Sequence, residues 1–210
     1  MKVILVNGSP HERGCTYTAL CETAEALNDS GVDTDLFWTG SRPLAGCTGC
    51  KSCGKRGKCV FDDTVNEFLE IAGDYDGYVF GSPVHWGGAT GAITSFMDRA
   101  FYADLQSGGE RFLLKPAAAV VSARRAGTTA TWDQINRYFA LMQMPIITSR
   151  YWSIVHGAAP EETKRDKEGM QAMRMLGRNM AFFLHCKNVA LKMGIKPPCR
   201  EDTVFTNFIR

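Results

Sequence analysis

Short apolar runs alternate along this chain with longer segments in which apolar residues recur at helical spacing. The expected strands lie at 3–6, 32–38, 77–82, 117–123 and 145–151, and the last extends to 155 as one strand or a strand pair. Runs of this length that open onto Gly-containing loops are typical of buried strands in a parallel sheet. Because helical segments separate the runs, the pattern predicts an α/β fold with helices on both faces of a parallel sheet.

Amphipathic helices are expected between and after these strands. The helical stripes cover 17–27, 65–72, 93–101, 132–142 and 173–184. Gly31 is expected to close the first helix, and TVNE at 64–67 has the pattern of a capping box at the start of the second. Pro160, followed by two glutamates, is expected to begin one long last helix.

No internal repeat and no long linker interrupts the pattern, so we expect a single domain. This domain covers 1–210, with a cysteine-rich loop at 46–59 and a C-terminal helix and tail at 160–210. The composition is that of an ordinary globular protein, with 45% apolar residues and a net charge of only +2. Such a charge argues against nucleic acid or an anionic membrane as the main partner. The apolar runs are too short for a bilayer span or a secretory signal, so we expect a cytoplasmic protein with reduced thiols.

The segment CTGCKSCGKRGKC at 47–59 holds four of the eight cysteines. Two residues separate Cys47, Cys50 and Cys53 from one another, and Cys59 follows after five more. This spacing suits a [4Fe–4S] cluster, because two-residue gaps let successive sulfurs of a turning loop face inward. Zinc, which four thiolates also suit, and a loop of free thiols are open alternatives. The cations that would offset the negative charge of a cluster are Lys51, Lys55, Arg56 and Lys58.

Three loops at the ends of predicted strands form a second candidate site. They cover 7–16, 81–90 and 122–129. The first places the hydroxyls of Ser9 and Thr16 before a helix N-terminus, which suits an anion, but it has neither a dinucleotide fingerprint nor a Walker A ending. The second offers the rings of His85 and Trp86 beside glycines. Each loop alone also fits an ordinary turn, but together they predict a pocket for a flat, phosphorylated ligand.

The order of several motifs resembles one known family. The motifs that carry the resemblance are ILVNGSP and GCT, the C-x2-C-x2-C motif, GSPVHWGG, and FMDR at 96–99. In this order they are similar to the flavodoxin-fold NAD(P)H-dependent FMN reductases, and more narrowly to the iron–sulfur flavoproteins among them. The resemblance covers about the first 130 residues, and the ending TNFIR at 206–210 is also similar. It implies a flavodoxin-like three-layer sandwich with strand order 2-1-3-4-5, bound FMN, a [4Fe–4S] cluster on the cysteine motif, and homodimers or homotetramers.

The resemblance also implies which residues would hold FMN. The phosphate would be held by Ser9, Arg13, Gly14, Cys15 and Thr16, and the isoalloxazine would be lined by Pro83, Val84, His85, Trp86, Gly87, Ser122, Ala123, Arg124 and Gly127. His11 and His85 stand where the family usually has Arg and Tyr, and Cys15 stands where it often has Asn. Compensation of the phosphate charge would then fall to Arg13 and stacking to Trp86. His85 is the candidate catalytic residue, because imidazole can change its charge near neutral pH.

Two hypotheses of function follow. The first is an FMN-dependent oxidoreductase that takes electrons from NAD(P)H or a small redox protein and passes them between FMN and the cluster. The second is a non-catalytic zinc- or thiol-containing module that acts through protein contacts or redox sensing. The colour of the purified protein separates the two, because only the first predicts a yellow or brown protein.

Overall fold

The computed structural model describes residues 1–199, 201, 204 and 206, so most of the TNFIR ending lies outside the described residues. Its parallel strands are β1 (Lys2–Asn7), β2 (Asp33–Trp38), β3 (Gly77–His85), β5 (Ala117–Ala123) and β6 (Ile154–His156). They lie in the order β2-β1-β3-β5-β6. The short β4 (Gly88–Ala89) pairs antiparallel with the end of β3. Once β4 is set aside, the expected order 2-1-3-4-5 is confirmed.

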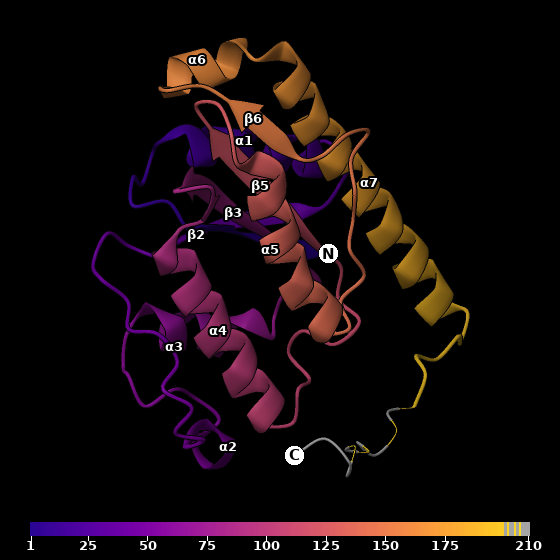
Figure 1. Ribbon diagram of the computed structural model, residues 1–210. Coiled ribbons are helices and arrows are strands. Elements are labelled where there is room, and N and C mark those ends of the chain that lie inside the picture. Colours follow the sequence, from indigo (N-terminus) through magenta and orange to yellow (C-terminus); the bar gives the residue numbers. More distant parts are fainter. Residues whose placement is uncertain (200, 202–203, 205, 207–210) are drawn as a thin grey trace.

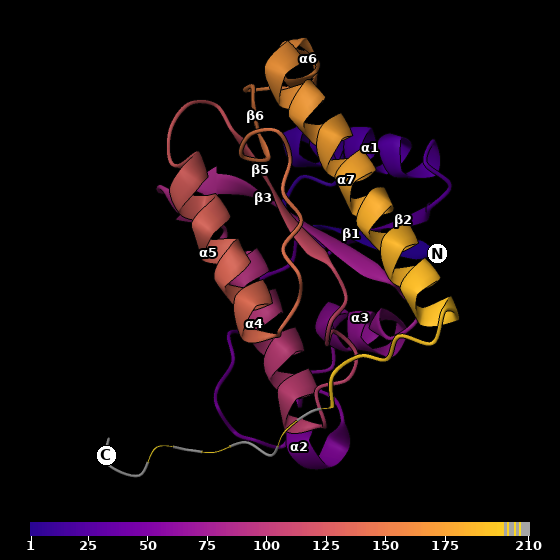
Figure 2. The same cartoon turned by 90° about the vertical axis from the view of Figure 1, so that its right-hand side faces the viewer.

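Helices cover both faces of the sheet. They are α1 (Cys15–Asn28), α2 (Cys53–Arg56), α3 (Thr64–Ala72), α4 (Gly91–Gln106), α5 (Thr128–Leu141), α6 (Pro160–Arg165) and α7 (Lys167–Lys192). Figures 1 and 2 show α3, α4 and α5 on one side of the sheet and α1 and α7 on the other. Within the described residues, none of these helices combines the length and apolar character that a membrane span requires.

Each face of the sheet has its own apolar core, because successive side chains of a strand point to opposite faces. On β3, Tyr78 and Phe80 pack with the aromatic residues of α3, α4 and α5, while Val79 faces α1 and α7. The close approach of α7 to α1 depends on Gly177, where an added Cβ would lie 2.6 Å from the Thr23 carbonyl oxygen.

The fifth strand differs from the prediction of 145–151. Ile146 forms only an isolated bridge with Ala117, after which the chain leaves the sheet and returns as β6, with Ile154 opposite Val121. Residues between these two points do not continue the ladder. Tyr151 and Trp152 are exposed there, and their ring centroids lie 4.7 Å apart. The prediction of one strand over 145–151 is therefore wrong, because part of this segment forms an irregular edge of the sheet.

The last helix also begins later than predicted. Pro160 begins only the short α6, and Asp166 begins α7 with a non-helical ψ of 82°. Its carboxylate accepts hydrogen bonds from the backbone N–H of Gly169 at 2.9 Å and of His156 at 2.7 Å. This side chain therefore caps α7 and holds the end of β6 to it, which breaks the expected single helix in two.

The other helix ends need one further correction. The residue that caps α3 is Asp63, whose carboxylate accepts from the Val65 N–H at 3.1 Å, and not Thr64 as the capping-box pattern predicted. Gly31 follows α1 with a φ of 76°, and its N–H donates to the Asn28 carbonyl. The expectation that this glycine closes the first helix is confirmed.

Candidate functional site

A hollow of about 630 Å³, including its open mouth, lies where β1, β3, β5 and β6 end. We call it the sheet-edge pocket. Its walls are formed by Ser9, His11, Gly14, Cys15, Thr16, Pro83, Val84, His85, Ser122, Ala123, Arg124, Gly157 and Ala158. Parallel sheets bind ligands outside the carboxyl ends of their strands, which is where this hollow lies.

The first wall is the loop between β1 and α1, which local hydrogen bonds hold in shape. The Asn7 side chain accepts from the Ser9 N–H at 3.1 Å and donates to the Glu12 carbonyl at 2.9 Å. The Ser9 hydroxyl in turn accepts from the His11 N–H at 3.1 Å. Gly14 is the extended N-cap of α1, and no side chain of the described residues caps this helix. Its N-terminal N–H groups are therefore available to an anion in the pocket.

The second wall is the hairpin from β3 to β4. Its tight turn places Trp86 at φ 50° and Gly87 at φ 80°, the left-handed pair that two-residue hairpins favour. The indole of Trp86 is fully exposed at the tip, so it does not line the pocket. Gly127 supports the turn from behind, because an added Cβ there would lie 2.8 Å from the Val84 side chain and 2.9 Å from Gly87.

Buried polar contacts join the remaining walls. The hydroxyls of Thr16 and Ser122 lie 2.8 Å apart, which ties the start of α1 to the end of β5. The Cys15 thiol donates to the Gly157 carbonyl at 3.6 Å and so reaches the loop after β6. Sequence reasoning missed Gly157 and Ala158; their only signal was a run of small residues after a strand that was placed too early.

The structure brings most of the predicted flavin residues together. Those that line the sheet-edge pocket are Ser9, Gly14, Cys15, Thr16, Pro83, Val84, His85, Ser122, Ala123 and Arg124. Arg13 instead lines a neighbouring hollow between α1 and the α6–α7 segment. Trp86, Gly87 and Gly127 belong to the hairpin and its support. The role of each of these residues toward FMN stays a prediction.

The four clustered cysteines line a second cavity of about 320 Å³, including its open mouth. We call it the cysteine cavity. It is formed by Cys47, Thr48, Cys50, Lys51, Cys53, Cys59, Val60, Phe61, Arg99, Tyr102 and Ala103. Cys47 and Cys50 are exposed, Cys59 is half-buried, and Cys53 is buried. The pKa of the Cys53 thiol is raised by burial most of all, and the nearby thiols of Cys50, Cys47 and Cys59 raise it further. The four cysteines therefore border one shared space.

Positive backbone φ angles let the loop turn around this cavity. Gly49, Lys51 and Gly57 have φ values of 66°, 57° and 69°. Gly57 ends α2 in the left-handed conformation, with its N–H donating to the Cys53 carbonyl at 2.8 Å. The pKa of the Cys50 thiol is lowered, first by the backbone N–H of Ser52 and then by hydroxyl groups nearby. A lowered pKa favours the thiolate, which is the form that binds metals.

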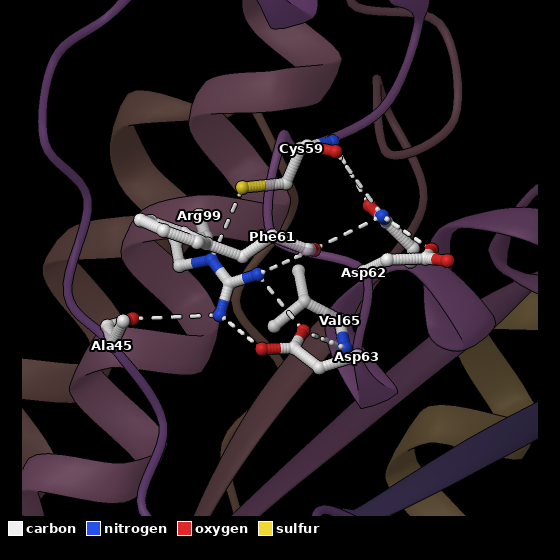
Figure 3. Close-up of polar contacts among 8 residues, drawn as sticks. Ala45, Cys59, Phe61, Asp62, Asp63, Val65 and Arg99 are labelled. Carbon is white, nitrogen blue, oxygen red and sulfur yellow. Dashed lines mark hydrogen bonds and ion pairs between the residues drawn. The ribbon is translucent and has the colours of Figure 1, made fainter.

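Side chains from α3, from α4 and from the segment after α4 hold the loop at its base. Asn66 accepts from the Cys59 N–H at 2.9 Å and donates to the Cys59 carbonyl at 3.1 Å. Arg111 donates to the Gly57 carbonyl at 3.3 Å and to the buried Asp104 at 3.1 Å. Arg99 lies beside Cys59 at the centre of a larger network (Figure 3). The second half of the loop is therefore fixed to the core.

The two sites are separate. Thr90, the N-cap of α4, donates to the Gly8 carbonyl next to the sheet-edge pocket, whereas Tyr102 of the same helix lines the cysteine cavity. At 1.5 Å per residue, Thr90 and Tyr102 lie about 18 Å apart along α4. Among the described residues, no three His, Cys, Asp or Glu side chains are grouped so that they could hold a single metal ion. A [4Fe–4S] cluster binds its thiolates through different irons, so four thiols around one cavity fit its ligand set.

The chain is similar to known proteins over most of its length. Residues 1–159 match the NADPH-dependent FMN reductase family. An iron–sulfur flavoprotein of Methanocaldococcus jannaschii is 33% identical over 187 residues, which cover 86% of this chain and 96% of that protein. Among solved structures, RosB with a bound riboflavin 5′-phosphate derivative covers 100% of this chain and 94% of its own, with a TM-score of 0.70 and 13% identity.

A flavodoxin from the domain Archaea is also similar, with a TM-score of 0.59 and 15% identity over 88% of this chain and 99% of the flavodoxin. At these identities the two solved structures establish the fold, which is flavodoxin-like. The match over 1–159 and the full-length relative establish more. The chain belongs to the NADPH-dependent FMN reductase family, in its iron–sulfur flavoprotein branch, and is an FMN-dependent oxidoreductase.

Proposed function

We propose that this oxidoreductase takes electrons from NAD(P)H or a small redox protein and exchanges them between FMN and a [4Fe–4S] cluster held by Cys47, Cys50, Cys53 and Cys59. FMN can accept two electrons together and release them singly, and an iron–sulfur cluster carries one electron at a time. The observation that carries the proposal is the presence of two separate sites on one chain, a pocket beside the N-terminus of α1 and four thiols around one cavity.

In the sheet-edge pocket, the loop from Ser9 to Thr16 would bind the phosphate of FMN. The N-terminal amides of α1 supply hydrogen-bond donors and a partial positive charge there. Gly14 belongs to this wall, and because glycine has no Cβ, a ligand can approach its backbone closely. His85 would face the flavin ring or the nicotinamide, because its exposed imidazole lines the same pocket.

In the cysteine cavity, the four thiols would ligate the cluster. The spacing of three of these cysteines at successive two-residue gaps favours a cluster over zinc, whose ligands typically come as two separated pairs. The surrounding cations would offset the negative charge of a thiolate-bound cluster. Of these, Lys51, Lys55 and Arg56 are exposed on the loop. The cytoplasm is the compartment in which such thiols stay reduced, and we place the protein there.

The direct test is the composition of protein purified without oxygen. Iron, sulfide and zinc are measured together with the visible spectrum, and the released chromophore is compared with FMN and FAD standards. Iron and sulfide in a 1:1 ratio together with FMN are expected. Zinc or no metal, with no brown chromophore after reconstitution with iron and sulfide, would reject the cluster. Recovery of FAD, or of no flavin, would reject the pocket assignment.

Serine variants locate the cluster. Replacement of any one of Cys47, Cys50, Cys53 and Cys59 by serine should lose or alter the cluster, because an alkoxide is a poorer iron ligand than a thiolate. The matched control is Cys21→Ser, since Cys21 lies on α1 away from the cavity. FMN content should be unchanged in all five variants, because the two sites share no lining residue among those that the structure describes. A wild-type cluster in a Cys53→Ser protein would contradict the assignment.

We also propose that the protein forms homodimers or homotetramers. The outer face and end of α7 carry exposed apolar side chains, among them Phe182, Val189 and Met193, which a second copy could cover. Light scattering at micromolar concentrations tests this, and a particle of the 23.1 kDa chain mass at all concentrations would refute it.

A further inference from the structure

We propose that Arg99 is a positioning residue of the cysteine cavity, which holds Cys59 in place and donates a hydrogen bond to its sulfur, so that the cluster becomes easier to reduce. The inference rests on the proposed function, because it concerns the cluster that the four cysteines would ligate. Arg99 belongs to the FMDR motif, and nothing in the flavin chemistry accounts for it.

The guanidinium of Arg99 is wholly enclosed, with a side-chain exposure of 0%. Its terminal nitrogens form four hydrogen bonds to the segment that carries the cysteines (Figure 3). Two reach the carboxylate of Asp63, at 2.7 and 2.8 Å, and two reach the carbonyls of Phe61 at 3.0 Å and Ala45 at 3.4 Å. One side chain of α4 therefore joins both ends of the cysteine-rich loop.

The remaining N–H of Arg99 points at sulfur. Its Nε–H donates to the Sγ of Cys59 at 3.2 Å, so all five N–H groups of the guanidinium have partners. Because these five donors lie in one rigid plane, the four bonds to oxygen fix the direction of the fifth. The ring of Phe61 lies over the guanidinium at 5.1 Å and restricts it further. The bond to Cys59 is thus set by the network before any cluster binds.

A donor held at a ligating sulfur affects the energy of reduction. Reduction adds negative charge to a cluster and its thiolates, and a hydrogen bond from a cationic donor stabilises the more negative state. Asp63 balances the charge of Arg99 at long range, but the N–H remains directed at the sulfur. The cluster should therefore have a higher reduction potential with Arg99 than without its Nε–H.

The test compares Arg99→Lys with Arg111→Lys in protein reconstituted without oxygen. Lysine at position 99 keeps a positive charge beside Asp63 but lacks the planar fork. Arg111 is the matched control, because it also binds the loop, at the Gly57 carbonyl, but donates there to backbone oxygen rather than to sulfur. Iron, sulfide and FMN contents are measured first, and the midpoint potential of the cluster is then measured by a redox titration followed by electron paramagnetic resonance.

At a given potential, the ratio of oxidised to reduced cluster should be about tenfold higher in Arg99→Lys than in the wild type. For a one-electron couple this is a shift of the midpoint potential by about 59 mV to lower values. Loss of the cluster with retained FMN would also support the proposal, since it shows that Cys59 needs Arg99. Arg111→Lys should lower thermal stability and leave the potential unchanged. A wild-type cluster content and potential in Arg99→Lys, or an equal shift in Arg111→Lys, would overturn the proposal.

A second measurement covers the case in which Arg99→Lys does not fold, which loss of FMN would reveal. Protein labelled with ¹⁵N-arginine, and carrying Arg56→Lys and Arg111→Lys to remove the other arginines on the loop or bound to it, is reduced and studied by pulsed paramagnetic resonance. A ¹⁵N coupling to the cluster is expected, and its absence would overturn the bond to Cys59. Wild-type protein that takes up no cluster would overturn the proposed function as well, whereas a bound cluster without shift or coupling overturns this inference alone.

Discussion

Replacing Asp63 by asparagine should destabilise the protein by about 3 kcal/mol, because it leaves the buried cation of Arg99 without a counter-charge. Breaking a buried ion pair from one side costs about 3–5 kcal/mol, and the low end applies since Asp63 is 30% exposed while Arg99 is 0% exposed. Asparagine can still cap α3, so Asp63→Ala should lose about 1 kcal/mol more. For a chain of this size, 3 kcal/mol corresponds to a fall in Tm of about 6–12 °C.

The assay is urea unfolding of the metal-free, reduced protein, followed by circular dichroism, with the slope of the transition checked for constancy. The matched control is Asp62→Asn, because Asp62 is exposed and contacts only Asn66 in the hydrogen bonds of this segment, at 3.2 Å. This control should change stability by about 0.5 kcal/mol or less. Equal, small effects of Asp62→Asn and Asp63→Asn would refute the reasoning that the Arg99 cation depends on Asp63.

Three further predictions concern the pocket and the sheet. Gly127→Ala should lower the free energy of unfolding by about 2 kcal/mol and weaken FMN binding, because the alanine would have a φ of 88° and its Cβ would clash with Val84 and Gly87. Unchanged flavin titration and urea unfolding curves would contradict this prediction. Trp86→Gly should weaken FMN binding, because the indole, which does not line the sheet-edge pocket itself, would cover the flavin from the exposed hairpin tip; Tm should not fall, because glycine relieves a left-handed φ of 50°. Unchanged affinity would mean that the indole does not touch the flavin. The pKa of Asp35 is lowered from 3.8, first by a hydrogen bond from Lys2 and then by one from Tyr75, so its stabilising effect is present above about pH 4 and is lost as pH falls through the folded pKa. The free energies of unfolding of the wild type and Asp35→Asn should therefore differ at pH 6 and converge in acid. A difference that stays constant with pH would argue against this linkage.

The parts of the fold that the sequence predicted well are those with one dominant local signal. β1, β3 and β5 are buried on both faces, so their apolar runs mark them with errors of a few residues at most. Gly31 was a dependable helix end, because a left-handed φ singles out glycine. The cysteine spacing likewise indicated four thiols in one place, and they do line one cavity.

The errors arise where a distant partner decides the local structure. Asp166 ends one helix and begins the next because the N–H of His156, ten residues earlier, shares its carboxylate. Asp63 takes the cap of α3 while it also pairs with Arg99, which lies 36 residues away. Residue type and spacing carry no information about such long-range pairings.

The break in the fifth strand affects how this sheet can meet other chains. An exposed edge strand is a template on which another chain can add a strand and begin aggregation. Here the outer edge offers only the three residues of β6, about 10 Å of ladder, and the isolated bridge before it follows Pro145, which has no N–H to donate. An incoming strand would find too few groups in register to bind. Self-association at this side of the molecule must therefore use helices and loops rather than a sheet that continues from one copy to the next.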